Sequence, residues 1–274
     1  MNVAPSVVSR QIADTERNIG LPLFERNARG MALTEAGELV LEHSRRVLEE
    51  SSLLTEQLGL LKGVQQRRVR ILCGEGFLAD VLEYGLGSFV KVYPDVQYDL
   101  QLGSTESVLD GIANGDADIG IAYNPLLDTR VRSLAISRQP LCVVTPPEHP
   151  LLKKDRLYLA DCAGLPNALL RSGHGITQLV TRVAADRGFA IAPLVETTSI
   201  DVLRRFVIAG LGISFLPRFA VSTELARGAV GIRELSDPPL AEASAHLMVR
   251  ARRRLPLSVE RLSGFLAGSM AAFR

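Results

Sequence analysis

The sequence predicts an α/β protein in which a short N-terminal module and one long helix precede two lobes. Three observations support this fold class. A helix-like segment followed by a tight hairpin occupies residues 3–37. Residues 38–63 then contain no proline and repeat apolar residues at seven-residue intervals. From residue 67 onward, short β-branched runs alternate with amphipathic helix patterns, which is typical of βαβ units.

The first predicted helix opens at Pro5 and Ser6. Proline is tolerated in a first helical turn, and serine is a favoured cap residue. Val8, Ile12 and Ile19 recur at helical spacing, so we expect them to face a core. The other faces of this helix are polar.

The segment 38–63 is predicted to be one long helix with a self-pairing face. Residues at intervals of seven are Val40, Val47, Leu54 and Leu61. A seven-residue repeat keeps an apolar seam on one side of a slightly supercoiled helix, so the segment is suited to pairing with a second copy of itself. Serines at positions 44 and 51 interrupt a second row beside it. The alternative is an amphipathic helix packed on its own chain.

The remainder of the chain is predicted to form two lobes. Lobe one comprises residues 67–138 and 242–274, and lobe two residues 139–241, with crossings near 137–140 and 238–243. Predicted strands are 69–73, 96–102, 116–123, 141–145, 168–171, 191–195, 213–216 and 244–249. Predicted helices in lobe two and at the end of the chain are 176–186, 200–209 and 256–268. This order predicts parallel sheets covered by helices on both faces, as in periplasmic-binding-protein-like folds.

The N-terminal residues resemble the DNA-binding domain of LysR-type transcriptional regulators. The matching motifs are Ser9-Arg10-Gln11-Ile12, Ile19-Gly20, Pro22-Leu23-Phe24-Glu25-Arg26 and Leu33-Thr34-Glu35-Ala36-Gly37. The resemblance implies that residues 1–37 are a partial winged helix-turn-helix, with recognition helix and wing but without the helices that normally precede them. It also implies that residues 38–66 are a linker helix used for dimerisation.

The two-lobed part resembles the effector-binding domain of the same family. The matching stretches are Phe89-Val90-Lys91-Val92-Tyr93-Pro94-Asp95-Val96, Leu109-Asp110-Gly111, Gly115-Asp116-Ala117-Asp118-Ile119-Gly120, His149-Pro150-Leu151, Thr198-Ser199-Ile200, Gly210-Leu211-Gly212-Ile213 and Leu216-Pro217. With the N-terminal motifs, the resemblance covers essentially the whole chain. It implies a small-molecule effector domain over residues 67–274.

Candidate DNA-contacting residues lie on the first helix and the hairpin: Ser6, Ser9, Arg10, Gln11, Arg26 and Arg29. Arginine pairs bidentately with guanine and glutamine with adenine, and hydroxyls bind base edges or phosphates. The first turns of a recognition helix are the part that enters the major groove. Residues 1–37 hold four arginines against four acidic residues, so affinity would come from geometry and dimerisation. Alternatively, the segment is a capped surface helix with solvated arginines.

Candidate effector-binding residues follow predicted strands or precede predicted helices: Glu75, Gly76, Ser104, Thr105, Tyr123, Asn124, Thr197, Thr198 and Ser199. In open α/β sheets, ligands bind beyond the carboxyl ends of strands, where helix starts offer free N–H groups. Hydroxyl and backbone donors suit a carboxylate or another small anion. The charge of Glu75 would instead repel an anion or select a cationic or amide-bearing effector. The alternative for each hydroxyl is plain helix capping.

Composition and missing motifs exclude several classes of protein. A net charge of +1 argues against a broad surface that coats nucleic acid, and the arginines at 250 and 252–254 are expected to form a solvated face. Cys73, Cys142 and Cys162 form no CxxC pair, so we expect buried reduced thiols and neither a metal nor another cofactor. The sequence shows no membrane-spanning run or secretory signal, which predicts a cytoplasmic protein. It also lacks the common nucleophile, zinc-hydrolase and P-loop motifs, so we do not expect an enzyme.

The function predicted from these features is a ligand-responsive, DNA-binding transcriptional regulator of LysR type. Its expected partners are promoter DNA, a small effector in the cleft between the lobes, and further copies of itself in a homodimer or homotetramer. The alternative is a headless solute-binding module that dimerises without binding DNA.

Overall fold

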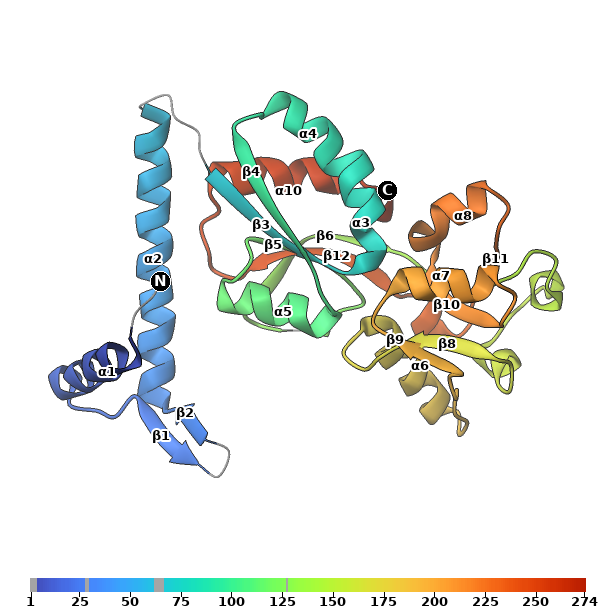
Figure 1. Ribbon diagram of the computed structural model, residues 1–274, viewed down its shortest axis with the longest axis horizontal. Helices are drawn as coiled ribbons and strands as arrows, with labels where there is room; N and C mark the ends of the chain where they lie inside the picture. Colours follow the sequence, from blue (N-terminus) through green and yellow to red (C-terminus); the bar gives the residue numbers. More distant parts are fainter. Residues whose placement is uncertain (1–3, 28–29, 62–66, 127) are drawn as a thin grey trace. The chain divides into compact units, whose positions relative to one another are not determined.

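The computed structural model describes residues 4–27, 30–61, 67–126 and 128–274 (Figure 1). The chain divides into two compact units, Met1–Val64 and Gln65–Arg274. The first unit holds the predicted helix, hairpin and long helix. The second holds two five-stranded sheets with their helices.

The N-terminal unit confirms the predicted helix, hairpin and long helix. Its elements are α1 (Pro5–Ile19), β1 (Phe24–Asn27), β2 (Gly30–Leu33) and α2 (Glu35–Leu61). The two strands pair antiparallel, as the hairpin requires. The predicted cap at Ser6 is wrong. Pro5 already occupies the first helical turn, so the cap position falls on Ala4, whose side chain accepts no hydrogen bond.

The face of α1 that was expected to pack on a core is exposed. The side chains of Val8 and Ile19 are 44% and 43% exposed, and no described residue of α1 is buried. Within the described residues, a polar contact fixes this helix to the hairpin. The carboxylate of Glu16 accepts hydrogen bonds from the amides of Leu23, at 2.7 Å, and Phe24, at 3.3 Å.

The first turn of α2 packs tightly on the chain before β1. The hydroxyl of Thr34 donates to the carbonyl of Pro22 at 2.7 Å and accepts from the amide of Gly37 at 3.0 Å. A Cβ atom at Gly37 would lie 2.0 Å from the carbonyl oxygen of Leu23. Glycine is therefore the residue that lets the helix start approach this carbonyl.

Lobe one is a mixed sheet with the strand order β4–β3–β5–β12–β6. Its strands are β3 (Arg67–Cys73), β4 (Val96–Leu102), β5 (Ile119–Tyr123), β6 (Val131–Arg138) and β12 (Ser244–Arg250). Its α-helices are α3 (Leu78–Asp80), α4 (Gly87–Val92), α5 (Thr105–Asn114) and α10 (Leu257–Ser269). Ile71 and Leu72 are neighbours on β3 yet belong to different hydrophobic clusters, because successive strand residues point to opposite faces. Both faces of this sheet are therefore covered, as predicted.

Lobe two has the strand order β11–β7–β10–β8–β9. Its strands are β7 (Leu141–Thr145), β8 (Asn167–Leu170), β9 (Val195–Thr197), β10 (Ile213–Pro217) and β11 (Gly231–Glu234). Its α-helices are α6 (Gly175–Asp186), α7 (Ile200–Ile208), α8 (Ser222–Ala226) and α9 (Pro238–Ala241). The strand expected at 191–195 is displaced to β9, and the sequence did not predict β6 and β11.

The prediction of wholly parallel sheets is wrong for two strands. β7 runs antiparallel to β10 and β11, and β12 runs antiparallel to β5 and β6. β7 and β12 each begin directly after the chain has crossed from one lobe to the other. Their neighbouring strands instead end at the boundary between the lobes, so they run in the opposite direction. The remaining pairs are parallel. In lobe one, β3 pairs with β4 and with β5, and in lobe two, β8 pairs with β9 and with β10.

Asp118, just before β5, ties three segments of lobe one together. Its carboxylate accepts from the amide of Arg70 at 3.0 Å, from the guanidinium of Arg70 at 3.1 Å and from Arg253 at 2.9 Å. Burial raises the pKa of Asp118, but the hydrogen bonds from Arg70 and the charge of Arg253 outweigh this effect and leave the pKa below its usual value. The arginine run was predicted to be solvated. This is wrong for Arg250, which is buried, and for Arg253, whose side chain is only 7% exposed.

We expect Asp118→Ala to lower the free energy of unfolding by about 3–5 kcal/mol, because the substitution removes a buried carboxylate that forms ion pairs with Arg70 and Arg253. Urea denaturation followed by circular dichroism measures this change, with the exposed Asp116→Ala as control. The folded-state pKa of Asp118 is depressed. Its contribution is therefore fully present above the unfolded pKa, about pH 4, and is lost as the pH falls through the folded pKa. A difference between wild type and variant that stays constant into strong acid would contradict this account.

Candidate effector cavity and DNA-facing helix

A cavity of about 390 Å³ lies between the two lobes, beyond the carboxyl ends of β3, β4 and β5. Lobe two contributes the starts of α6 and α7 and the segment after β10. Apolar wall residues include Phe77, Ile176 and Phe219, and polar ones include Ser104, Thr105 and Thr198. The cavity therefore offers an apolar body and a few hydroxyl groups to a ligand.

The structure brings six of the nine candidate effector residues to this cavity: Glu75, Gly76, Ser104, Thr105, Tyr123 and Thr198. The other three, Asn124, Thr197 and Ser199, are not among its wall residues. The hydroxyl of Thr197 accepts from the amide of Ser199 at 3.1 Å, which is a local turn contact. The sequence did not predict that Phe77 and Phe219 line the cavity, because an apolar residue next to a strand cannot be distinguished by sequence from a core residue.

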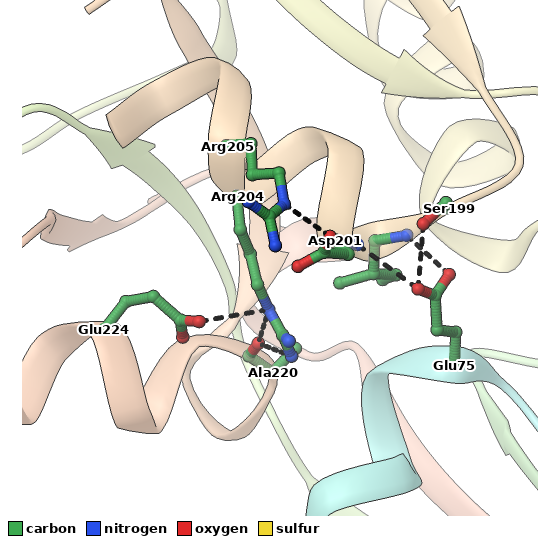
Figure 2. A network of polar contacts seen from close by, with 8 residues as sticks. Glu75, Ser199, Asp201, Arg204, Arg205, Ala220 and Glu224 are labelled. Carbon is green, nitrogen blue, oxygen red and sulfur yellow. Dashed lines mark hydrogen bonds and ion pairs between the residues drawn. The ribbon is translucent and has the colours of Figure 1, made fainter. Parts of the chain in front are cut away.

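One bridge between the lobes is made by Glu75 (Figure 2). One carboxylate oxygen accepts from the hydroxyl of Ser199 at 2.9 Å and from the amide of Asp201 at 3.3 Å. The other oxygen accepts from the amide of Ile200 at 2.6 Å. These amides belong to the first turn of α7, which has no intrahelical acceptor for them. A lobe-one carboxylate therefore caps a lobe-two helix.

The second bridge joins α5 to the start of α6. The buried hydroxyl of Thr105 accepts from the amide of Gly175 at 2.9 Å and donates to the carbonyl of Tyr123 at 3.4 Å. Beside it, the amide of Glu106 donates to the carbonyl of Gly173 at 3.1 Å. A Cβ atom at Gly175 would lie 2.1 Å from the carbonyl oxygen of Tyr123. The approach of the lobes at this bridge therefore requires glycine.

Aromatic packing also crosses the boundary. The rings of Phe77 and Phe219 stack with their centroids 4.5 Å apart, and the ring of Tyr123 lies 6.4 Å from that of Phe219. The hydroxyl of Tyr123 donates to the carbonyl of Gln139 at 2.7 Å, and burial raises the pKa of Tyr123 well above its usual value. Tyr123 thus lines the cavity, and its hydroxyl is bonded to the segment that crosses between the lobes.

The three thiols of the second unit are buried, as predicted. Burial raises the pKa of Cys73, Cys142 and Cys162 to about 12 in each case. Because the thiolate is the reactive form, we expect iodoacetamide at neutral pH to leave these thiols unmodified in the folded chain and to label them after denaturation. Mass spectrometry measures the labelling. The exposed Ser88→Cys variant is the control, and native thiols that react as fast as its new cysteine would contradict the prediction.

The candidate DNA-contacting side chains on α1 are exposed: Ser6, Ser9, Arg10 and Gln11. Successive helix residues are rotated by about 100°, so the first three share the face opposite Val8, and Gln11 lies to one side. Arg26 is exposed on β1. Arg29 lies outside the described residues.

The predicted seam of α2 is open in the single chain. Val47 and Leu54 are 54% and 57% exposed, and Val40 is half-buried. The side chain of Leu61 lies outside the described ones. Two exposed leucines, Leu48 and Leu58, extend the apolar surface beside the seam.

Comparisons with known proteins identify the family. The LysR substrate binding domain matches residues 62–271, and the bacterial regulatory helix-turn-helix domain of the lysR family matches residues 1–38. The chain therefore belongs to the LysR family of bacterial transcriptional regulators.

Individual relatives agree with this assignment. The HTH-type transcriptional activator CmpR of Synechocystis is 27% identical over 236 residues, which is 85% of this chain and 76% of that relative. A full-length OxyR variant from Pseudomonas aeruginosa superposes with a TM-score of 0.71 at 22% identity, covering 97% of this chain and 87% of the other. The Synechocystis CcmR regulatory domain in complex with 2-PG gives a TM-score of 0.64 at 19% identity, covering 73% and 96%. The curated relative is named as a transcription factor, in agreement with the prediction that this chain is not an enzyme.

Two kinds of feature are absent from the described residues. None of their helices is both long and apolar enough to span a membrane. They contain no group of three or more histidine, cysteine or acidic side chains that could hold a metal ion.

Proposed function

We propose that this transcriptional regulator binds promoter DNA through α1 and its hairpin, and binds a small effector in the cavity between the lobes. The cavity itself supports the effector proposal. Strand ends and helix starts from both lobes enclose it. The CcmR regulatory domain, which shares this fold, is in complex with 2-PG. Six of the effector residues expected from the sequence line the cavity, and these are the residues we assign to the effector.

For DNA, we assign base contacts to exposed polar side chains of α1, namely Ser6, Ser9 and Arg10 on one face and Gln11 to one side of it. Exposed hydroxyl, guanidinium and amide groups on a helix suit base edges in the major groove. Arg26 and Arg29 are assigned to phosphates or an adjacent minor groove.

For assembly, we assign the seam of α2 to pairing with a second copy. The seam residues are Val40, Val47, Leu54 and Leu61. Such pairing removes apolar side chains from water and joins two DNA-contacting modules in one molecule. Further pairing through the lobes would give a homotetramer.

Effector control follows from the two bridges between the lobes. A ligand shifts a conformational equilibrium only by its difference in affinity for the two states. A ligand that contacts both cavity walls would lose contacts if the lobes moved apart, so its affinity depends on their arrangement. It therefore changes the arrangement of the lobes, and through the oligomer the spacing of the DNA-contacting modules.

A reporter fused to the DNA that flanks the gene tests this function in cells. The wild-type chain should change reporter expression in a manner that depends on the growth medium. Thr198→Trp fills the cavity and should hold expression at one level, whereas Leu194→Trp, on an exposed position outside the cavity, should respond as wild type does. A reporter that the wild-type chain leaves unchanged in every medium would contradict the proposal.

A second candidate is a solute-binding module that dimerises without DNA affinity. The exposed Val8 and Ile19 favour it, because no described residue of α1 is buried against a core. This candidate predicts the same ligand binding and dimerisation, but no specific retention on DNA.

A further inference from the structure

Helix α7 has its first turn capped by a residue from the other lobe. Ser199 precedes the helix but makes no side-chain cap to it. Its hydroxyl instead donates to the carboxylate of Glu75. This carboxylate also accepts hydrogen bonds from the amides of Ile200 and Asp201 (Figure 2). The three donors converge on one half-buried carboxylate from lobe one.

This arrangement has the chemistry of an occupied anion site. The start of a helix carries a positive partial charge and free N–H groups, and carboxylates bind there through charge-assisted hydrogen bonds. α7 runs over nine residues, which is long enough for this effect. Here the anion is a side chain of the protein itself.

The neighbouring cations of α7 are engaged elsewhere. Arg205 pairs with Asp201 at 2.6 Å. Arg204 donates to the carbonyl of Ala220 at 2.8 Å and lies 3.8 Å from Glu224 (Figure 2). The groups that hold Glu75 are therefore the donors of the helix start rather than a guanidinium.

We propose that Glu75 is a built-in anionic ligand of the effector domain. Its carboxylate fills the anion position of α7 and latches the two lobes together. A carboxylate or phosphate effector would meet a like charge and donors already in use at this end of the cavity. The cavity therefore selects a neutral or cationic effector. This last step rests on the proposed function, whereas the latch itself does not.

Rescue by acetate tests the latch. Glu75→Ala removes the carboxylate and leaves its three donors in place. In chloride, we expect the Tm of the full-length variant to fall by about 4–8 °C. In acetate of equal ionic strength, the Tm of the variant should rise by about 2–4 °C more than that of wild type, because acetate enters the vacated position.

Matched controls separate this effect from general stabilisation. Acetamide has the shape of acetate without its charge and should not rescue the variant. Glu83→Ala, at an exposed position of lobe one, should show no differential response to acetate. An equal acetate effect on wild type and Glu75→Ala, or none on either, would overturn the proposal.

If Glu75→Ala does not fold, Glu75→Gln keeps the shape of the side chain but places an amide against the helix amides. Spin labels on Ser88→Cys in α4 and Ala185→Cys in α6 then report the distance between the lobes, because the native thiols are buried. With the labelled chain diluted into excess unlabelled chain, so that pairs of labels within one chain dominate, the latch predicts one narrow distance in the parent chain and an additional longer one in Glu75→Gln. Identical distributions would overturn it. Neither readout needs DNA, so a failure of the regulator proposal is detected separately, in the reporter assay.

Discussion

Leu54→Glu should convert the regulator to a monomer and weaken its binding to promoter DNA by about 100-fold or more. Leu54 is 57% exposed on the seven-residue seam of α2, together with Val47. A glutamate at this position would bring a carboxylate into an apolar interface and would have to lose its hydration on pairing. The loss in DNA affinity follows because two linked modules bind far more tightly than either one alone.

Analytical ultracentrifugation measures the oligomeric state, and fluorescence anisotropy measures the DNA affinity. Glu42→Gln is the control, because it changes one charge on the side of α2 away from the seam. We expect this control to keep the oligomeric state and the affinity of wild type. A Leu54→Glu chain that remains dimeric at the same concentrations would show that α2 packs on its own chain instead.

Arg10→Ala should lower the affinity for the specific site by about 10- to 100-fold per bound module and should relax base preference. Arg10 lies in the early, exposed part of α1, where a guanidinium reaches base edges if the helix enters the major groove. Arg26→Ala is the matched comparison on β1. It should weaken specific and scrambled DNA alike and reduce the salt dependence of binding, as loss of a phosphate contact does.

Titrations of specific and scrambled duplexes at several salt concentrations distinguish the two variants. The ratio of the two affinities should fall for Arg10→Ala and stay constant for Arg26→Ala. If Arg10→Ala leaves this ratio unchanged, the base contacts do not come from this face of α1.

Local patterns predicted most of the fold. Buried strands such as β5 and β7 are continuous apolar runs, and α6 and α7 carry helical periodicity, so each could be located from its own residues. The directions of β7 and β12 could not, because they depend on where the chain changes lobes. The exposed face of α1 was also missed, because helical spacing shows which residues share a face but not whether another element covers it.

The location of the candidate cavity could be predicted from the sequence, but the contacts of its charged residue could not. The rule that ligands bind beyond strand ends led to Ser104, Thr105 and Thr198, which line the cavity. Glu75 was recognised as an unusual charge there, but its partners lie more than a hundred residues further along the chain. Sequence spacing contains no signal for such a contact between lobes.

The measurement that tests the central claim most directly is binding of this 274-residue chain to the DNA flanking its own gene. Fluorescence anisotropy at a stated salt concentration, with unlabelled nonspecific DNA as competitor, gives the result. A regulator that reads DNA through α1 should remain bound in excess competitor and should lose this resistance in Arg10→Ala. A folded, dimeric chain that excess competitor displaces completely would contradict the account and would favour the solute-binding module without DNA affinity.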